Sequence, residues 1–390
     1  MLLLIDASRA NNEQKTGVEW YGFFVIQELK KIVSPDTRVI LYTREPLKGE
    51  LTNLPPNWKE QVLPWPPRRL WTQIRLSWEI WRVKSGSRNY AAGVPKKEIV
   101  LFVPAHVLPL VCPTRTFITI HDLGGLRFPS GYSLFEKWYA RFATWFALRC
   151  ATVFTPSEFS KREIESVFGN GKITVVPNGF DDSKYHLIDD KEAIGKIVEK
   201  YNIKPPYFLS ISRLEEKKNT VGIIEAYKIF QEKILLKSNL ENYSLVLLGK
   251  PGYGYKKVTD AIRKSGYQHT IIIPGWVEAE DVPYLMAGAS AFVFPSFYEG
   301  FGIPVLEAMA CGVSIVASNR AALPEVADGA ALLVDPYKPG DIAQAMLEIV
   351  SSSALKEELV RRGLTRVREF GWEKTARGIW EQLCNHTICD

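Results

Sequence analysis

The sequence predicts an α/β protein made of two doubly wound domains, each a parallel sheet with helices on both faces. Three observations support this prediction. Short apolar runs alternate with amphipathic segments along nearly the whole chain of 390 residues. Most of these runs are continuously apolar, as expected for strands that are covered on both faces. The length suits two domains of ordinary size, and repeated strand–helix alternation is typical of doubly wound sheets.

The apolar runs form two series, one in each half of the chain. In the N-terminal half, strands are predicted at 2–6, 37–42, 99–103, 117–120, 152–155 and 173–176. In the C-terminal half, they are predicted at 207–211, 244–248, 271–273, 291–294, 314–317 and 331–334. Helical patterns lie between them, so each series predicts one sheet.

The boundary between the two series is predicted near 176–182. Turn-forming residues cluster there, a charged stretch follows, and a new strand begins after Pro205-Pro206. A hinge is therefore expected at about 180–204. Two domains joined in this way would face each other across a cleft, and ligands of such sheets bind beyond the carboxyl ends of the strands.

Composition excludes several classes of protein. The longest uncharged stretch, 282–298, contains two prolines, so no membrane-spanning helix is predicted. The initial apolar run ends at Asp6 and is too short for a signal peptide. Five scattered cysteines without a C-x-x-C pair indicate a reducing compartment, so a cytoplasmic location is expected. Residues 1–185 carry 25 basic and 17 acidic side chains, a net +8, which favours anionic partners or a solvated basic surface.

The segment 294–312 has the most informative pattern. It predicts a strand, a loop and a helix that begins near Pro304 and ends before Gly312. Gly300 and Gly302 allow backbone N–H groups to approach a phosphate or sugar just before a helix N-terminus. Two carboxylates, Glu299 and Glu307, lie eight residues apart. The alternative is a glycine-rich connection with two solvated carboxylates.

This segment resembles the E-x7-E motif of retaining glycosyltransferase family four, the large "glycosyl transferases group 1" family. Four further segments, taken in chain order, resemble that family at 210–219, 248–252, 274–277 and 370–376. The resemblance implies a GT-B fold whose C-terminal helix returns to the N-terminal domain. It also implies an acceptor-binding domain at 1–185 plus about 370–390, and a nucleotide-sugar-binding domain at 195–369.

The resemblance assigns donor contacts to charged side chains of the C-terminal half. Arg213 and Lys218 would hold the donor diphosphate, with Lys217 as the competing lysine. Fixed cations stabilise the negative charge that develops on a leaving nucleoside diphosphate. Glu299, assigned as catalytic, would contact the donor sugar, and Glu307 would accept hydrogen bonds from the ribose.

Two backbone segments complete the expected donor site. The first would bind the sugar and diphosphate, and the second would flank the base, although Trp276 could instead be a core aromatic residue. These donor-binding residues are Gly300, Phe301, Gly302 and Ile303 in the first segment, and Gly275, Trp276 and Val277 in the second.

In the N-terminal half, the resemblance singles out a histidine and a glycine. His121, at a predicted strand end, would orient the transferring sugar as a catalytic residue, whereas Asp122 could cap the turn. Gly17 would let a backbone N–H reach the phosphates or the acceptor. The chain departs from the family's G-G-x-E-R loop here, because Thr16 replaces the first glycine and Trp20 the arginine.

The resemblance implies retaining transfer of a hexose to a saccharide or lipid-linked saccharide, with a nucleotide sugar as co-substrate. No other cofactor, no metal and no nucleic acid are expected. Segments at 121–129 and 155–160 resemble mannosyltransferases of surface-polysaccharide assembly, which makes GDP-mannose the first choice of donor. UDP-glucose and UDP-N-acetylglucosamine are the alternatives. Other classes left open are a nucleotide-sugar epimerase, a phosphorylase and a non-catalytic sugar-binding protein.

The segment 64–84 predicts an amphipathic helix that could touch the inner face of a membrane. At about 100° per residue, one stripe would be apolar and a row beside it basic, while a further face would pack on the sheet. The apolar stripe is Trp71, Ile74, Trp78 and Trp81, the basic row Arg68, Arg75 and Arg82, and the packed face Leu76, Ile80 and Val83. The alternative is that both apolar faces are buried.

Overall fold

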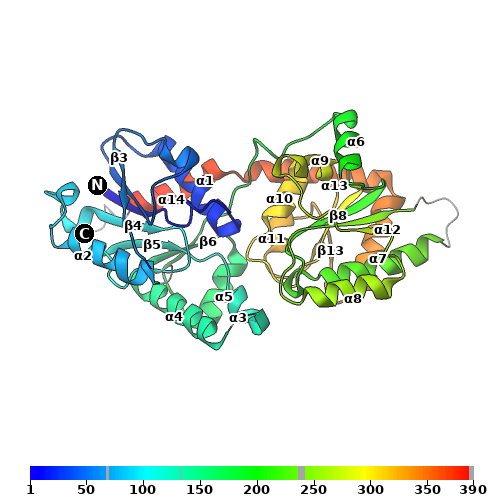
Figure 1. The fold of residues 1–390 in the computed structure, drawn as a ribbon, viewed down its shortest axis with the longest axis horizontal. Helices are drawn as coiled ribbons and strands as arrows, with labels where there is room; N and C mark the ends of the chain where they lie inside the picture. Colours follow the sequence, from blue (N-terminus) through cyan, green and yellow to red (C-terminus); the bar gives the residue numbers. More distant parts are fainter. Residues whose placement is uncertain (67–69, 132, 236–241, 386–390) are drawn as a thin grey trace. The chain divides into compact units, whose positions relative to one another are not determined.

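The computed structural model describes residues 1–66, 70–131, 133–235 and 242–385 (Figure 1). The chain divides into two compact units. The first unit comprises Met1–Gly179 and Trp372–Asp390, and the second comprises Phe180–Gly371. Each unit contains one parallel sheet with helices packed on it, which confirms the predicted doubly wound fold.

The sheet of the first unit has seven parallel strands in the order β3-β2-β1-β4-β5-β6-β7 among the described residues. They are β1 (Leu2–Asp6), β2 (Arg38–Thr43), β3 (Trp58–Val62), β4 (Ile99–Val103), β5 (Arg115–Thr119), β6 (Thr152–Thr155) and β7 (Ile173–Val175). The sequence did not predict β3. It is an edge strand with only Trp58 fully buried, so it lacks the continuous apolar run that marks the central strands.

Helices of the first unit follow the strands. The longer ones are α1 (Gly17–Ile32), α2 (Ser77–Lys84), α4 (Leu134–Cys150), α5 (Glu158–Phe168) and α14 (Trp372–Asn385). The shorter ones are η1 (Gly49–Thr52), η2 (Trp71–Leu76), η3 (Asn89–Ala91), η4 (Lys96–Glu98), α3 (Gly124–Arg127) and η5 (Pro129–Gly131).

The C-terminal helix α14 belongs to the first unit, as the resemblance implied, and packs there against α1. The ring of Trp372 stacks on Phe24 with centroids 5.2 Å apart. Thr375 Oγ1 donates a hydrogen bond of 2.7 Å to the carbonyl of Pro177. The guanidinium of Arg115, on β5, donates to the carbonyl of Leu383. These contacts join the end of the chain to the sheet of the first unit.

The described strands of the second unit form a six-stranded parallel sheet in the order β10-β9-β8-β11-β12-β13. They are β8 (Tyr207–Ile211), β9 (Ser244–Leu248), β10 (Ile271–Ile272), β11 (Ala291–Phe294), β12 (Ile315–Ser318) and β13 (Leu332–Val334). Successive side chains of β8 enter different cores, Tyr207 on one face of the sheet and Phe208 on the other. This alternation is the geometry of a strand covered on both sides.

Helices cover both faces of this second sheet (Figure 1). The longer ones are α6 (Lys191–Lys200), α7 (Thr220–Leu235), α8 (Tyr255–Ser265), α10 (Ile303–Ala310), α12 (Pro339–Ser351) and α13 (Ser353–Arg366). The shorter ones are η6 (Glu216–Lys218), η7 (Ala279–Asp281), α9 (Val282–Ala287), α11 (Leu323–Ala327) and η8 (Val367–Glu369).

The segment expected to be a hinge is packed onto the second unit. Phe180, Tyr185 and Val198 are buried in one of its cores, the last of them from helix α6. The chain passes between the units at Gly179–Phe180 and again at Gly371–Trp372. The charged residues of this stretch lie on the solvent-exposed side of a packed segment. Because charged residues are also typical of linkers, the sequence pattern resembled a linker.

Within the segment 64–84, residues 71–84 form a helix, but not with the single register expected. It starts as a π-helical turn, η2, and continues as α2. Trp71 and Leu76 are both buried. In a π-helical turn, with its i→i+5 hydrogen bonds, residues five apart lie on the same side of the helix, so both can face the core. Trp71 is therefore a core residue and does not belong to the exposed stripe, whereas Ile74, Trp78 and Trp81 are exposed. Arg68 lies outside the described residues.

Across the described helices, none combines the length and the apolar character that crossing a membrane requires.

Candidate functional site

The candidate site of the second unit lies where β8 and β11 are neighbours. Strand order runs from β8 to β10 on one side and from β11 to β13 on the other, so the connections diverge at this point. In open parallel sheets, ligands bind at such a switch point, beyond the carboxyl ends of the strands. The two loops that leave this edge are joined to each other. Phe297 N donates to Lys217 O at 3.0 Å, and Asn219 Nδ2 donates to Pro295 O at 3.1 Å.

An ion pair links these loops at the centre of the site. Lys218 Nζ lies 2.5 Å from Glu299 Oε1, and both side chains are largely buried. Lys217 points elsewhere, with its ammonium 5.6 Å from the ring centroid of Tyr298. Of the two candidate lysines, the structure thus brings Lys218 to Glu299. Sequence reasoning named both partners but not their pairing, because they are far apart along the chain.

Arg213 occupies the turn after β8. Its side chain is 68% exposed, and its closest ionic partner is Glu215, with Nε and Oε2 3.8 Å apart. An exposed, loosely paired guanidinium can turn toward an anion at low cost. Arg213 is therefore a second cation near the strand ends of the switch point.

The glycine-rich loop reaches helix α10 through Gly302, which has a φ of +112°. This conformation is rare for residues that have a Cβ. A Cβ at this position would also lie 2.6 Å from Leu323 Cδ2. Phe301 is turned into the core, where its ring meets Phe370 edge-to-face at 5.8 Å. The residues Gly300 to Ile303 therefore offer backbone groups, together with the partly exposed Ile303, at the start of the helix.

Glu307 lies on α10 with its carboxyl group in a poorly solvated position. Burial raises its pKa to about 7, and the negative charge of Asp181 adds to the rise, while Lys184 opposes it. In the described part of the chain, no hydrogen bond or ion pair engages this carboxyl group. Glu307 is thus a carboxyl group close to its midpoint of ionisation at neutral pH and available to a ligand.

The loop 274–277 presents its tryptophan to solvent. Trp276 is 69% exposed, so the alternative of a core aromatic residue is wrong. Lys250 Nζ lies 5.3 Å from its ring centroid, and the indole N–H donates to Glu278 at 3.1 Å. Gly275 provides the turn with a φ of +80°, and Val277 anchors the loop in the core. The indole face is held in place and open to a planar ligand.

In the first unit, His121 follows the end of β5. Its ring lies between Tyr21 and His106, with centroid distances of 4.5 and 5.1 Å. Burial and the neighbouring His106 lower its pKa to about 3, against the opposing charge of Asp122, so the imidazole is neutral. Its Nε2 is buried and has no hydrogen-bond partner among the described residues. Asp122 caps the turn by accepting from Gly124 N at 2.8 Å.

Gly17 is the first residue of α1. The preceding Thr16 is the N-cap, and Glu19 closes a capping box with it. Glu19 also pairs with Arg9 at 3.4 Å. Thr16, which replaces the first glycine of the family pattern, therefore has a structural role. Its side chain takes part in the capping box, which a glycine could not form.

A pocket of about 580 Å³ opens at the switch point of the first unit, where β1 and β4 are neighbours. Sequence reasoning did not find it, because its walls come from separate loops and from three helices, α1, η2 and α4. It is lined by Asp6, Ser8, Arg9, Thr16, Val18, Glu19, Arg44, Leu70, Trp71, Thr72, Gln73, Ala105, His106, Val107, Phe135 and Tyr139. Arginines, a buried carboxyl group and aromatic rings suit a polar ligand that also has apolar surface.

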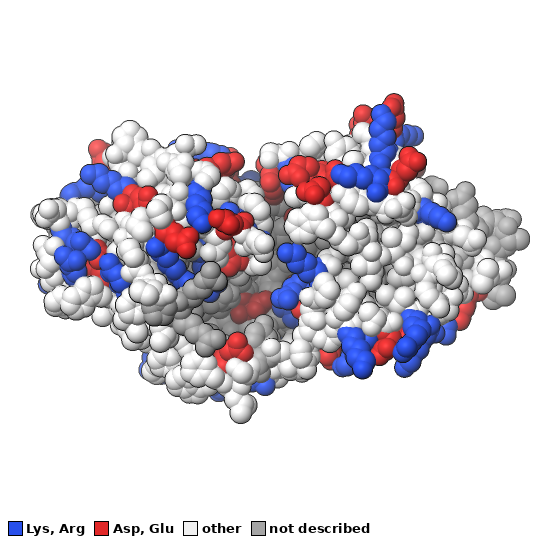
Figure 2. Space-filling model, in the orientation of Figure 1, with Lys and Arg blue, Asp and Glu red and all other residues white. Residues whose placement is uncertain are grey.

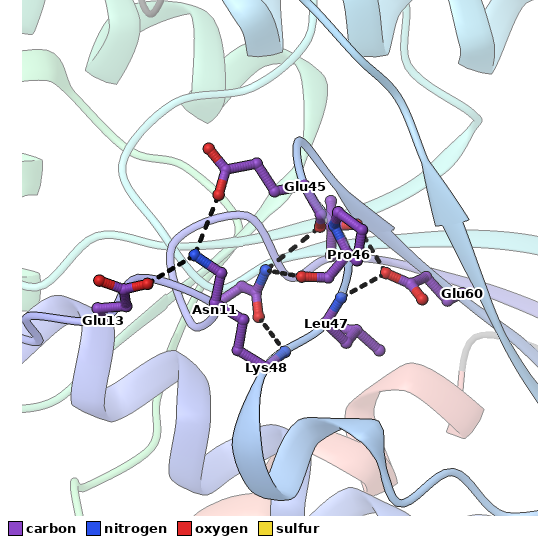
Figure 3. A network of polar contacts seen from close by, with 8 residues as sticks. Asn11, Glu13, Glu45, Pro46, Leu47, Lys48 and Glu60 are labelled. Atoms are coloured by element: carbon purple, nitrogen blue, oxygen red, sulfur yellow. Dashed lines mark hydrogen bonds and ion pairs between the residues drawn. The ribbon is translucent and has the colours of Figure 1, made fainter.

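A polar network fixes the two loops that carry Arg9 and Arg44 (Figure 3). Asn11 Nδ2 donates to the carbonyl of Pro46 at 3.0 Å, and its Oδ1 accepts from Lys48 N at 2.9 Å. The Lys48 ammonium bridges Glu13 and Glu45 at 2.9 and 3.1 Å. The loop after β1 and the loop after β2 are therefore held as one wall of the pocket.

No group of three or more histidine, cysteine, aspartate or glutamate side chains is arranged to hold a metal ion within the described residues.

Comparison with known proteins identifies relatives for both halves. The family model "Glycosyl transferases group 1" matches residues 193–366, and "Glycosyltransferase Family 4" matches residues 31–184. O-antigen chain mannosyltransferase B of Escherichia coli is 31% identical over 261 residues, which cover 66% of this chain and 67% of that protein. The serotype-specific mannosyltransferase WbdA of Escherichia coli is 29% identical over 196 residues, which cover 50% of this chain but 23% of WbdA.

Solved structures share the fold over the whole chain. Sucrose-phosphate synthase from Thermosynechococcus elongatus superposes with a TM-score of 0.72 at 17% identity, covering 99% of both chains. HepE from Anabaena, solved in complex with UDP and glucose, has a TM-score of 0.73 at 18% identity and covers 98% of both chains.

Proposed function

Because the chain belongs to the group 1 glycosyltransferases and has their GT-B fold, we propose that it is a retaining mannosyltransferase. The donor is GDP-mannose, bound by the second unit, and the acceptor is a saccharide or a lipid-linked saccharide, bound by the first. The choice of mannose rests on two of the relatives, O-antigen chain mannosyltransferase B and WbdA, which are 31% and 29% identical to this chain. UDP-glucose and UDP-N-acetylglucosamine are the competing donors, and HepE was solved with UDP-glucose.

The observation that carries the proposal is the buried Lys218–Glu299 pair at the switch point. A nucleotide sugar presents a diphosphate beside a row of hydroxyl groups. The ammonium of Lys218 suits the diphosphate, and the carboxylate of Glu299 suits the hydroxyl groups. In the free protein these two groups pair with each other, and in the complex each of them binds one part of the donor. Arg213 adds a second cation as the diphosphate leaves.

The base and ribose have their own contacts in this proposal. The exposed indole of Trp276 stacks on the base, and the carboxylate of Glu307 accepts hydrogen bonds from the ribose hydroxyl groups. The backbone N–H groups at the start of α10 face the phosphate oxygens, where the helix dipole favours negative charge.

The chemical step proceeds on one face of the sugar. The bond from C1 to the GDP oxygen breaks, the acceptor oxygen bonds to C1 on the same side, and the acceptor proton passes to the departing phosphate. His121 keeps in this proposal the role that the resemblance implies, which is to orient the transferring sugar, and its imidazole is neutral over the whole physiological range. It neither gains nor loses a proton during transfer.

Slow hydrolysis of the donor tests this stereochemistry without a known acceptor. In GDP-mannose the sugar is an α anomer, so front-face attack by water is expected to release α-mannose first. Proton NMR at early times, before mutarotation, distinguishes the two anomers. Initial release of β-mannose would contradict retention, and enzyme-independent hydrolysis is measured in parallel as the control.

A further inference from the structure

Helix α4 exposes a row of large apolar side chains. Leu134 is 84% exposed and Trp138 61%, and Phe135, Phe142 and Trp145 are exposed as well. The rings follow one another along the helix, with centroids 6.2 Å apart for Phe135–Trp138, 5.6 Å for Trp138–Phe142 and 6.0 Å for Phe142–Trp145. Their spacing of three and four residues puts them on one side of the helix.

The other side of α4 already makes the contact with the sheet. Ala143, Thr144 and Ala147 are its buried residues, and they are small. A helix of this kind would normally bury its aromatic side chains and expose its small or polar ones. An exposed apolar stripe of this size on a folded chain marks an interaction surface.

The charges on α4 have one sign on the exposed side. Arg149 covers the ring of Trp145, with its guanidinium carbon 4.6 Å from the centroid. Arg141 is exposed as well, and its guanidinium carbon lies 6.0 Å from the ring centroid of Phe168 on α5. The one acidic residue of the helix, Glu136, is engaged in the capping box with Ser133 at its start. The exposed stripe is thus aromatic and basic.

A second exposed apolar group continues this surface from η2 and α2. It contains Ile74, Trp78 and Trp81, and the two tryptophan rings lie 5.2 Å apart. Gln73 Nε2 of η2 donates to Tyr139 Oη of α4, so the two helices are neighbours. In Figure 2, Lys and Arg side chains gather over the region of α2. We call these exposed residues of η2, α2 and α4 the aromatic surface.

We propose that the aromatic surface docks on an anionic lipid bilayer, with its rings at the headgroup level and Arg141 and Arg149 on the lipid phosphates. Tryptophan together with arginine is the composition of helices that lie in a membrane interface, and the one acid of α4, Glu136, is held in the capping box at the start of the helix. The surface also flanks the pocket of the first unit, whose lining includes Leu70, Gln73 and Phe135. Docking would hold that pocket where the head of a lipid-linked acceptor lies, and this last point rests on the proposed function.

Vesicle co-sedimentation tests the proposal. The full chain is mixed with vesicles of phosphatidylcholine alone or with added phosphatidylglycerol. The wild type is expected to sediment with the anionic vesicles. Trp138→Ser/Trp145→Ser and Arg141→Ser/Arg149→Ser should each lower the partition coefficient by about tenfold or more. The matched control is Tyr253→Ser, which removes an aromatic ring that is 54% exposed on the second unit and should change nothing.

Three results would overturn the proposal. They are a wild type that stays in solution, double variants that sediment like the wild type, and equal sedimentation with neutral and anionic vesicles. A wild type that ignores vesicles and elutes as a dimer would make the surface a protein interface instead. Stabilisation by GDP-mannose is measured on every variant. If GDP-mannose stabilises the protein but the wild type does not bind vesicles, the docking proposal is wrong and the donor proposal stands. If the wild type binds vesicles but GDP-mannose does not stabilise it, the donor proposal is wrong and the docking proposal stands.

Discussion

Glu299→Ala should lower kcat/KM for sugar transfer by about two to three orders of magnitude, the range found when one stabilising group of a transition state is removed. In this account Glu299 binds the donor sugar, and it also positions the ammonium of Lys218 at 2.5 Å. The change therefore removes one contact and disturbs a second, because it leaves the largely buried charge of Lys218 without its partner. Initial rates of GDP release, measured at increasing GDP-mannose concentrations with saturating acceptor or with water, give kcat/KM for both proteins.

Glu192→Ala is the matched control. Glu192 is an exposed glutamate on α6 of the same unit and also pairs with a lysine, at 2.6 Å from Lys196. Its loss should leave the rate unchanged, because exposed pairs contribute little. Thermal unfolding of both variants establishes that they are folded. A Glu299→Ala protein that is folded and transfers at the wild-type rate would remove Glu299 from the donor site.

Donor affinity should rise with pH through about 7, the pKa of Glu307. Burial raises this pKa, so the free protein carries the protonated acid below pH 7 and the carboxylate above it. Only the carboxylate accepts two hydrogen bonds from the ribose, and donor binding therefore favours deprotonation. Near pH 7, binding should release about half a proton, since the site is half protonated at its pKa. Calorimetric titration in buffers of different ionisation enthalpy measures this release.

Glu307→Gln isolates the effect. The amide has a similar shape but does not titrate, so its donor affinity should be weaker at pH 8 and flat between pH 6 and 8. Wild-type affinity that is also flat, or that falls with rising pH, would contradict the assignment of Glu307 to the ribose. If the donor affinity of Glu307→Gln still changed between pH 6 and 8, a group other than Glu307 would be responsible for the pH dependence.

Central strands could be predicted from the sequence alone because burial on both faces leaves a local mark. The runs 2–6 and 207–211 coincide with β1 and β8 to the residue. The edge strand β3 has a half-exposed face and leaves no such run. The segment around Phe180 looked like a linker because its few buried residues are separated by exposed charged ones.

Contacts between side chains that are far apart in the sequence could not be predicted from local patterns either. The donor loops were recognisable by motif, but Lys218 and Glu299 meet only because β8 and β11 are neighbours. The pocket beside β1 depends on Arg9 and Arg44 from two loops that a polar network brings together (Figure 3). Trp71 shows the opposite failure. Its spacing matched an α-helical stripe, but the π-helical turn rotates it into the core.

Helix α4 was the least predictable part of the first unit. Aromatic residues at a spacing of three and four residues usually mark the buried face of a helix. Here the buried face is made of alanine and threonine, and the aromatic face is exposed. Periodicity finds the two faces of a helix, but only the packing of the whole unit determines which of them is covered.

Thermal unfolding with a panel of nucleotide sugars tests the central claim most directly, because a ligand that binds only the folded state raises its stability by an amount set by its Kd. The panel contains GDP-mannose, UDP-glucose and UDP-N-acetylglucosamine. We expect GDP-mannose to raise the Tm most, with stabilisation of about 2.7 kcal/mol at a hundredfold excess over Kd. A panel in which no nucleotide sugar raises the Tm, or in which a UDP-sugar raises it more than GDP-mannose, would contradict the account.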